Sequence, residues 1–322
     1  MKISVNAKNP IKLRDIIIAA CIVVAILVLG GIFDYKLTST VYIPGNESWF
    51  GIVGAALVEL PVCLGLGFAG GSLIFCRYKE KKVWEVFSIV IGALAILVSY
   101  YFVYDTFNDI SKDIIRMQEH ASIIKILAVF FAFIMEGLFV GLAALGRFKW
   151  GFDQHDMFIL GIAMIVIAAA SAIVSNGMKF LWSRPRPRYI FTLEDPEAAF
   201  HPLWKLDPFK SITASIKDKS FKSNNLKSFP SGHTVYAGTA MFVLPYIACC
   251  SPKVRDDRRI MVALFYVGML WCILAGLSRV YAGAHFLSDT AAGFGTTLLV
   301  GSLINYLLLF RKKKAPSEEP QA

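Results

Sequence analysis

The sequence predicts an all-α protein that crosses a lipid bilayer about eight times. Hydrophobic residues make up 56% of the 322-residue chain and charged residues only 17%. A soluble globular protein is about 45–50% apolar and about 25% charged. The apolar residues also form long stretches, each close to the roughly 20 residues that a helix needs to cross the hydrocarbon core. These two observations indicate a polytopic membrane protein and exclude a disulfide-rich secreted scaffold, a collagen and a coiled coil.

Eight apolar stretches are candidate membrane spans. The first follows a basic N-terminal segment, is long and lacks a clear small-residue cleavage site, so we expect a retained signal anchor. The sixth stretch is the shortest. In chain order, the eight stretches cover residues 15–33, 51–76, 83–104, 122–146, 156–178, 233–250, 260–277 and 286–310.

Lysine and arginine residues lie mainly in alternate connections, which predicts the orientation. They cluster in residues 2–14, 77–82, 147–149, 253–259 and 311–314. By the positive-inside rule we expect both termini to be cytoplasmic, in what we take to be a bacterial plasma membrane. The net charge of +10 does not indicate nucleic-acid binding, because the basic residues are bunched between spans instead of following one polar face.

The loop 179–232, on the predicted outer side, departs from this pattern. It contains ten basic residues, although long loops can be translocated regardless of charge. A cationic cluster on this side indicates an anionic ligand. The loop also carries large apolar residues, which suit either a segment at the headgroup level or a mobile solvated lid. These residues are Phe191, Phe200, Leu203, Trp204, Phe209 and Phe221.

Three short segments at predicted outer helix ends carry the residues suited to chemistry. The first has Lys179 followed, after six residues, by Arg186 and a proline. The second is residues 230–233, Pro-Ser-Gly-His, directly before the sixth span. The third is residues 278–289, in which Ser-Arg is followed by a histidine and then by an aspartate. Their shared location predicts one site.

The residue types in these segments suit a phosphate group. Lys179, Arg186 and Arg279 can supply positive charge and directed donors to a tetrahedral anion. Ser231 and Gly232 stand where a helix begins, so free backbone amides and the positive end of the helix dipole would face the anion. This combination predicts a binding site for a phosphoryl group.

Two histidines can then carry the reaction. His285 and Asp289 are four residues apart and share a helix face, so the carboxylate can fix one imidazole tautomer and leave the other nitrogen as a nucleophile. His233 can protonate a leaving oxygen near neutral pH. We expect neither a metal ion nor another cofactor, because no outer cluster of carboxylates suits magnesium.

The three segments resemble the type 2 phosphatidic acid phosphatase superfamily, which includes lipid phosphate phosphatases and undecaprenyl-diphosphate phosphatases. Its pattern, K-x6-R-P, P-S-G-H and S-R-x5-H-x3-D, is present at every fixed position. The resemblance implies that His285 forms a phosphohistidine, Asp289 orients it and His233 is the general acid. It implies that the phosphoryl oxygens are held by Lys179, Arg186, Ser231, Gly232 and Arg279. The implied partners are a membrane lipid substrate and the bilayer.

The resemblance also predicts how the chain is divided. We expect residues 1–82 to be an N-terminal tail with two additional helices, residues 83–310 a six-helix phosphatase core that includes the outer loop, and residues 311–322 a cytoplasmic polar tail. An anion transporter, a phospholipid-binding relative without catalysis, and an enzyme acting on a soluble phosphate ester are alternatives. The motifs specify the phosphoryl group but neither the group that carries it nor the oligomeric state.

Other polar residues are given structural interpretations. Arg184 and Arg188 have no position in the pattern and are interpreted as interfacial anchors, as basic residues beside a membrane helix usually are. Glu59 and Glu136 lie within apolar stretches, where we expect them to find hydrogen-bond partners. The remaining histidines, His120, His155 and His201, are interpreted as surface or capping residues.

Overall fold

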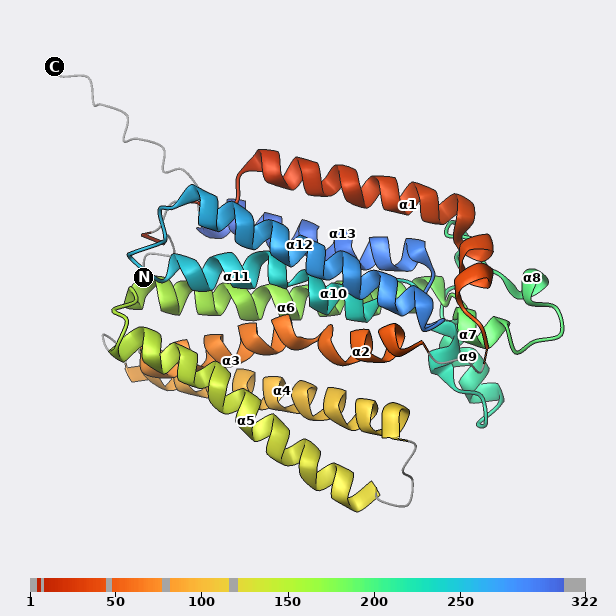
Figure 1. Ribbon diagram of the computed structural model, residues 1–322, viewed down its shortest axis with the longest axis horizontal. Coiled ribbons are helices and arrows are strands. Elements are labelled where there is room, and N and C mark those ends of the chain that lie inside the picture. Colours follow the sequence, from red (N-terminus) through yellow and green to blue (C-terminus); the bar gives the residue numbers. More distant parts are fainter. Residues whose placement is uncertain (1–4, 7–8, 45–47, 77–81, 116–120, 310–322) are drawn as a thin grey trace.

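The computed structural model describes residues 5–6, 9–44, 48–76, 82–115 and 121–309. The predicted tail 311–322 and His120 lie outside these residues. Within them every regular element is a helix (Figure 1). In chain order these are α1 (Leu13–Val41), α2 (Trp49–Leu57), α3 (Leu60–Phe75), α4 (Lys82–Ile115), α5 (Ala121–Phe148), α6 (Gln154–Trp182), α7 (Pro187–Ile190), α8 (Pro196–Ala199), α9 (Lys210–Lys217), η2 (Ser223–Leu226), α10 (Gly232–Gly238), α11 (Ala240–Cys249), α12 (Arg258–Tyr281), α13 (Leu287–Ile304) and η3 (Asn305–Leu309).

The all-helical architecture agrees with a polytopic membrane protein, but the count of spans differs from the prediction. Seven helical segments among the described residues are long and apolar enough to cross a membrane, where the sequence predicted about eight. The predicted span 233–250 is divided between α10 and α11. At the boundary both the amide and the hydroxyl of Thr239 donate to the carbonyl of Tyr236, at 3.2 and 2.7 Å. Because that carbonyl is already occupied, the regular helical ladder is interrupted there.

The helices form a bundle, and those that carry the three motifs lie in its middle (Figure 1). α6 and α10 to α13 pack together, while α1 lies along α13 and also contacts α12 (Figure 1). On the other side α3 contacts α4, α5 and α6. The predicted second span is likewise broken, into α2 and α3, near Glu59 and Pro61. Proline near the start of α3 is tolerated because the first amides of a helix lack intrahelical partners.

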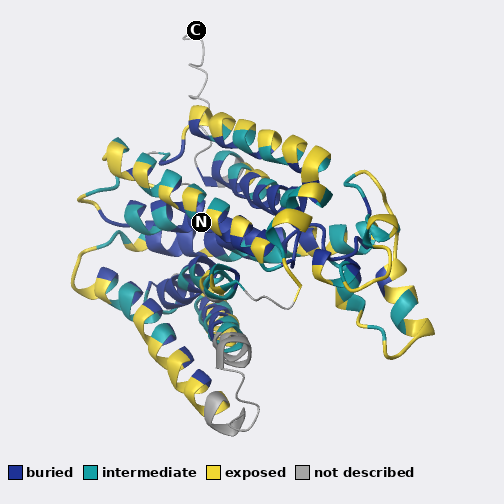
Figure 2. Ribbon diagram, turned by 45° about the vertical axis from the view of Figure 1, so that its right-hand side comes forward, coloured by how far each residue is buried: buried dark blue, intermediate teal, exposed yellow. Residues whose placement is uncertain are grey.

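The first helix buries one narrow face against this bundle. Its buried residues recur at intervals of four or seven positions, which is the spacing of one helix face. They are Asp15, Ala19, Val23, Gly30, Asp34 and Thr38. The other faces are apolar and exposed, as a lipid-facing helix requires (Figure 2). The division of the chain at residue 82 stays a prediction, yet α1 directly covers the helices that carry the motifs.

The outer loop is folded over the end of the bundle where α6, α10 and α12 meet. It contains α7, α8, α9 and η2 (Figure 1). Its middle is tied to α6, since the indole nitrogen of Trp182 donates to the Leu203 carbonyl at 2.8 Å and the Phe209 amide donates to the Phe180 carbonyl at 2.8 Å. Of the six loop residues named in the sequence analysis, Trp204 and Phe209 are exposed, at 74% and 53%, and the loop also exposes Leu206 and Ile216.

The two glutamates within the apolar stretches have hydrogen-bond partners, as predicted. The Ser99 hydroxyl donates to Oε2 of Glu136 at 2.6 Å, and the Thr106 hydroxyl donates to Oε2 of Glu59 at 2.9 Å. Both contacts join α4 to neighbouring helices on the α3–α5 side of the bundle. They therefore stabilise the packing of α4 against its neighbours.

Candidate active site

The sequence-predicted site residues come from five parts of the chain and meet at one end of the bundle. Lys179 lies in the last turn of α6 and Arg186 directly precedes α7. Ser231 is the N-cap of α10, which starts with Gly232 and His233. Arg279 lies in the last turn of α12, His285 in the turn that follows, and Asp289 in the first turn of α13.

The tautomer of His285 follows from its hydrogen bond to the backbone. Its Nδ1 lies 2.7 Å from the carbonyl oxygen of Ser228. A carbonyl only accepts, so Nδ1 carries the proton and the lone pair of Nε2 is available for attack. The imidazole itself is almost completely buried, with 1% of its surface exposed. The structure thus leaves Nε2 of this residue with a free lone pair.

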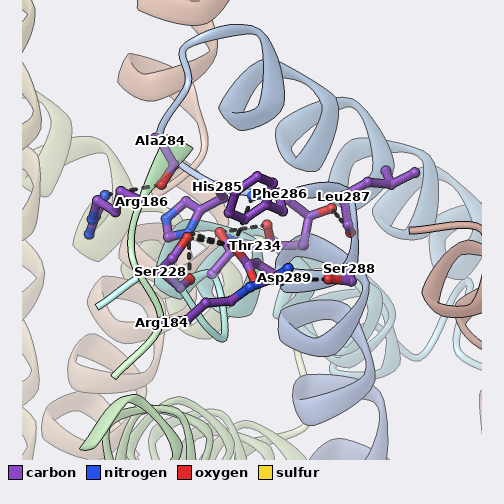
Figure 3. Close-up of polar contacts among 12 residues, drawn as sticks. Arg184, Arg186, Ser228, Thr234, Ala284, His285, Phe286, Leu287, Ser288 and Asp289 are labelled. Atoms are coloured by element: carbon purple, nitrogen blue, oxygen red, sulfur yellow. Dashed lines mark hydrogen bonds and ion pairs between the residues drawn. The ribbon is translucent and has the colours of Figure 1, made fainter. Parts of the chain in front are cut away.

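Asp289 supports His285 less directly than the sequence predicted. Its Oδ2 lies 3.9 Å from Nδ1 of His285, which is too long for a hydrogen bond. Instead Oδ2 accepts from the Ser228 hydroxyl at 2.5 Å and from the Phe286 amide at 2.8 Å (Figure 3). Ser228 therefore links the carboxylate to the imidazole, with its hydroxyl bound to one and its carbonyl to the other.

The second imidazole faces the first from another helix. The ring centroids of His233 and His285 are 6.3 Å apart, with 64° between the ring planes. The amide of Ser231 donates to the carbonyl of Asp289 at 2.9 Å, which ties the start of α10 to the start of α13. This backbone contact fixes the relative position of the two histidines.

The glycine of the second motif makes room for the lysine of the first. A Cβ atom at Gly232 would lie 2.9 Å from Nζ of Lys179, so any larger residue would displace the ammonium group. Ser231 caps the same helix, because its hydroxyl oxygen accepts from the amide and hydroxyl of Thr234 at 3.3 and 2.9 Å. The lysine charge is thereby held beside the first turn of α10.

The two arginines of the motifs are positioned by backbone carbonyls of other segments. Nε of Arg186 donates to the carbonyl of Asn224 at 2.9 Å, and its Nη2 donates to the side-chain oxygen of the same residue at 3.0 Å. Nη2 of Arg279 donates to the carbonyl of Gly51 on α2. The outer loop and the second helix thus each hold one cationic group at the site.

The surrounding positive charge keeps His285 neutral. Burial lowers the pKa of His285 well below its usual value, and the charges of Arg186, the nearby His233 and Lys179 lower this pKa further. A neutral imidazole retains the lone pair that a nucleophile needs. The same positive groups can stabilise charge on phosphoryl oxygens.

Three residues at the site were missed or misinterpreted from the sequence. Ser228 and Asn224 lie outside the motif positions, and the short distance of Ser228 from residues 230–233 was the signal available for it. The interpretation of Arg184 as an interfacial anchor is wrong, because its side chain is fully buried and its Nη1 donates to Oδ1 of Asp289 at 2.6 Å. The signal was its place in a second Arg-Pro pair, directly before Arg186.

Of the other histidines that the structure describes, His155 and His201, neither joins the imidazole pair. His155 lies in the first turn of α6, at the other end of that helix from Lys179. His201 is buried in the outer loop and its carbonyl accepts from Nε of Arg184 at 2.8 Å, so it is not a surface residue. No group of three or more His, Cys, Asp or Glu side chains with metal-binding geometry occurs in the described part of the chain.

The part of the chain that carries the site is also the part that matches a known protein family. The family model of the PAP2 superfamily matches residues 160–313. These residues contain every predicted site residue and run from α6 through α13. Residues 160–313 belong to the PAP2 superfamily. Helices α1 to α5 lie outside the PAP2 match.

Curated relatives of the chain also carry phosphatase names. Phosphatidylglycerophosphatase B of Haemophilus influenzae is 26% identical over 182 residues, which cover 52% of this chain and 73% of that protein. Phosphatidylglycerophosphatase B of Bacillus subtilis is 34% identical over 77 residues, 24% of this chain and 37% of that one. Lipid A 4'-phosphatase of Porphyromonas gingivalis is 24% identical over 164 residues, 50% and 56% of the two chains. No solved structure matches the chain significantly.

Proposed function

We propose that this protein is an integral-membrane phosphatase that hydrolyses a lipid phosphate or diphosphate through a covalent phosphohistidine at His285. The observation that carries the proposal is the pair of imidazoles with centroids 6.3 Å apart, bordered by cationic residues of α6, α12 and the outer loop. A phosphoryl group between the two rings would have a nucleophile on one side and a proton donor on the other. This is the arrangement that in-line displacement at phosphorus requires.

The first half-reaction forms the phosphoenzyme. Nε2 of His285 attacks phosphorus, a nitrogen–phosphorus bond forms, and the bond from phosphorus to the substrate oxygen breaks. Burial and the charges of Arg279, Arg186 and Lys179 lower the pKa of His233 in the empty site, and the negative charge of a bound phosphate would act to raise it. His233, protonated in the substrate complex, transfers its proton to that leaving oxygen, so an alcohol or a lipid monophosphate departs. Lys179, Arg186 and Arg279 balance the charge on the three remaining phosphoryl oxygens, which is the main electrostatic demand of such a transfer.

The second half-reaction restores the enzyme. Water attacks the phosphorus of the phosphohistidine, and the now neutral His233 accepts one of its protons. The nitrogen–phosphorus bond breaks, inorganic phosphate leaves, and His285 regains its lone pair with Nδ1 still bonded to the Ser228 carbonyl. His233 thus acts as the general acid in the first step and as the general base in the second, as is common in covalent catalysis.

A lipid substrate is supported by the surroundings of the site and by the names of the relatives. The relatives are named for phosphatidylglycerophosphate and lipid A phosphate chemistry. The outer loop that borders the site exposes Trp204 and Phe209, which suit the headgroup level of a bilayer. The basic connections at the opposite end support an outer location for the site, with both termini in the cytoplasm. In that arrangement the substrate phosphate would reach His285 from the outer leaflet.

A substrate panel on the purified protein in nanodiscs tests this function. We expect phosphate release from phosphatidate, phosphatidylglycerol phosphate or a polyprenyl diphosphate at a much higher kcat/KM than from glucose 6-phosphate, and we expect release to survive EDTA. Replacing both Trp204 and Phe209 by alanine should reduce the preference for long-chain substrates, since binding energy from the tail would fall. Changing the exposed Leu299 on α13 to alanine is the matched control. Equal turnover of the soluble ester would contradict the lipid assignment, and absence of phosphate release from the whole panel would contradict the phosphatase assignment.

A further inference from the structure

A buried ionic network joins the first helix to the aspartate of the third motif. Nη1 of Arg184 donates to Oδ1 of Asp289 at 2.6 Å and to the Ser288 hydroxyl at 2.8 Å (Figure 3). Nη2 of the same arginine donates to Oδ2 of Asp34 on α1 at 2.9 Å. Its Nε donates to the carbonyl of His201. One guanidinium therefore bonds to two carboxylates that lie on different helices.

The donors and acceptors of this network form a closed ring. The hydroxyl of Ser288 accepts from Arg184 and donates to Oδ2 of Asp34. The amide of Ser288 donates to Oδ1 of Asp34 at 2.9 Å. That amide is in the first turn of α13, where amides have no intrahelical partner, so Asp34 also caps α13 from a neighbouring helix. Losing any member would leave a buried polar group without its partner.

All three charged side chains of this network are buried. The side chains of Arg184 and Asp34 are 0% and 1% exposed, and that of Asp289 is 0% exposed. The guanidinium also lies against the rings of Phe286 and Phe200, with its carbon 4.4 and 5.5 Å from their centroids. Removal of one partner from a buried ion pair is costly because the other charge cannot turn to water. The orientation of Arg184 is consequently set by both carboxylates together.

The first helix is shaped for this contact. Gly30 lies one turn before Asp34 on the same buried face of α1. A Cβ atom at Gly30 would lie 2.5 Å from the amide nitrogen of Ser288, so only glycine lets α1 approach the start of α13 this closely. Two separate observations therefore place α1 against Ser288. The helix backbones approach closely at Gly30, and the Asp34 carboxylate accepts a hydrogen bond from the Ser288 amide.

We propose that Asp34 is a positioning residue of the phosphatase reaction. Asp34 draws one edge of the Arg184 guanidinium toward α1, and the opposite edge then holds Oδ1 of Asp289. This leaves Oδ2 of Asp289 directed at the Ser228 hydroxyl, beside the carbonyl that fixes His285. The inference rests on the proposed function, because it assigns Asp34 to the orientation of His285. It makes α1, which lies outside the family match, a part of the reaction machinery.

Asp34→Asn tests the proposal, since it keeps the size of the side chain and removes its charge. We expect kcat on the best lipid substrate to fall by about 10–100-fold, the usual effect of losing a group that orients a histidine through its partner. KM should change by less than about twofold, because Asp34 contacts none of the phosphate-binding residues. Asp15→Asn is the matched control: Asp15 is equally buried on the same face of α1 and pairs with Arg258 at the other end. It should leave kcat and KM near wild type.

A double-mutant cycle separates positioning from loss of stability. In an Asp289→Asn background we expect Asp34→Asn to change kcat by less than about threefold, because both act on one path and their effects are not additive. If Asp34→Asn does not yield folded protein, Ser288→Ala replaces it in both measurements, since it removes the hydroxyl that forms the second link between Asp34 and Arg184 beside their direct bond. It should show a smaller loss of kcat, again without a rise in KM.

The outcomes distinguish the proposal from the function on which it rests. A wild-type protein without phosphatase activity would overturn both. An active wild type whose Asp34→Asn variant matches Asp15→Asn would overturn the positioning role alone. A rise in KM at unchanged kcat, or fully multiplicative losses in the Asp289→Asn background, would also overturn it.

Discussion

The two ends of α1 each bury one aspartate, and the partners of these aspartates differ. Asp15 pairs with Arg258, whose side chain is 31% exposed. Asp34 pairs with Arg184, which has no exposed surface. An exposed arginine can bond to water when its partner is lost, whereas a buried one cannot. Removing an aspartate from this face of α1 should therefore have a different effect at each end, depending on whether water can reach the arginine that loses its partner.

The two ends of the bundle also differ in how far water reaches their other ion pairs. At the end with Asp15, Arg255 is 24% exposed and pairs with Asp153, which is also 24% exposed, and with the buried Asp156. At the end with Asp34, both side chains that bond to the Asp289 carboxylate, those of Arg184 and Ser228, are buried. We therefore expect substitutions at the site end to alter activity and substitutions at the opposite end to alter stability alone.

The largest expected effect is that of His285→Ala. With no nucleophile left, phosphoenzyme should be undetectable and turnover should fall to background. The measurement is the incorporation of labelled phosphate after an alkaline quench, which preserves phosphohistidine. His155→Ala, at the opposite end of the bundle, should retain activity within about twofold. Labelled enzyme in the His285 variant would show that another residue is the nucleophile.

The next largest effect is that of His233→Ala, and it depends on the leaving group. We expect a loss of about 10²–10⁴-fold in kcat on a lipid alcohol ester, because general acid catalysis usually contributes this much. An activated aryl phosphate, whose leaving oxygen needs little protonation, should lose much less. Measuring kcat on both substrates with the same variant checks this. Equal losses on the two substrates would contradict a general-acid role.

How much of this site the sequence predicts depends on whether the residues belong to a motif. The positions of Lys179, His233 and His285 could be predicted because fixed spacings carry them, and the structure brings them together. Asp34 could not, since its contact with Arg184 crosses the fold and no local spacing encodes it. For Ser228 the only local signal was its short distance along the chain from residues 230–233. The break at Thr239 was also hidden, because a hydroxyl that binds its own helix leaves the hydropathy of the segment unchanged.

An intermediate effect is expected for Ser228→Ala, which removes the hydroxyl bound to Asp289 and keeps the carbonyl bound to His285. We expect kcat to fall by about tenfold, because a hydrogen bond to a charged group contributes roughly 1.5–3 kcal/mol, while the Asp289 carboxylate keeps its bonds from the Phe286 amide and from Arg184. Ser220→Ala removes a similar serine–aspartate contact on the exposed part of the loop and serves as the control. A kcat for Ser228→Ala equal to that of the control would contradict the linking role of Ser228.

The smallest effect is expected at the opposite end, for Arg255→Gln. Arg255 bonds to Asp153 at 3.3 Å. Burial acts to raise the pKa of Asp153, but hydrogen bonds from the amide of Asp156, from Asn6 and from Arg255 outweigh it and lower this pKa below its usual value. A depressed carboxyl pKa contributes stability above the pKa of the unfolded chain, and that contribution disappears as the pH falls through the folded value.

Arg255→Gln should therefore reduce the free energy of unfolding at pH 7 by less than about 1 kcal/mol, the usual range for a partly exposed pair. The difference from wild type should begin to narrow as the pH falls below about 4, the pKa of an aspartate in the unfolded chain, and should disappear below the lowered pKa of Asp153 in the folded protein. Thermal unfolding of the detergent-solubilised proteins across this pH range measures it, and kcat should stay within about twofold of wild type. A loss of kcat comparable to that of Ser228→Ala would show that the two ends of the bundle are coupled, and the contrast between them would have to be abandoned.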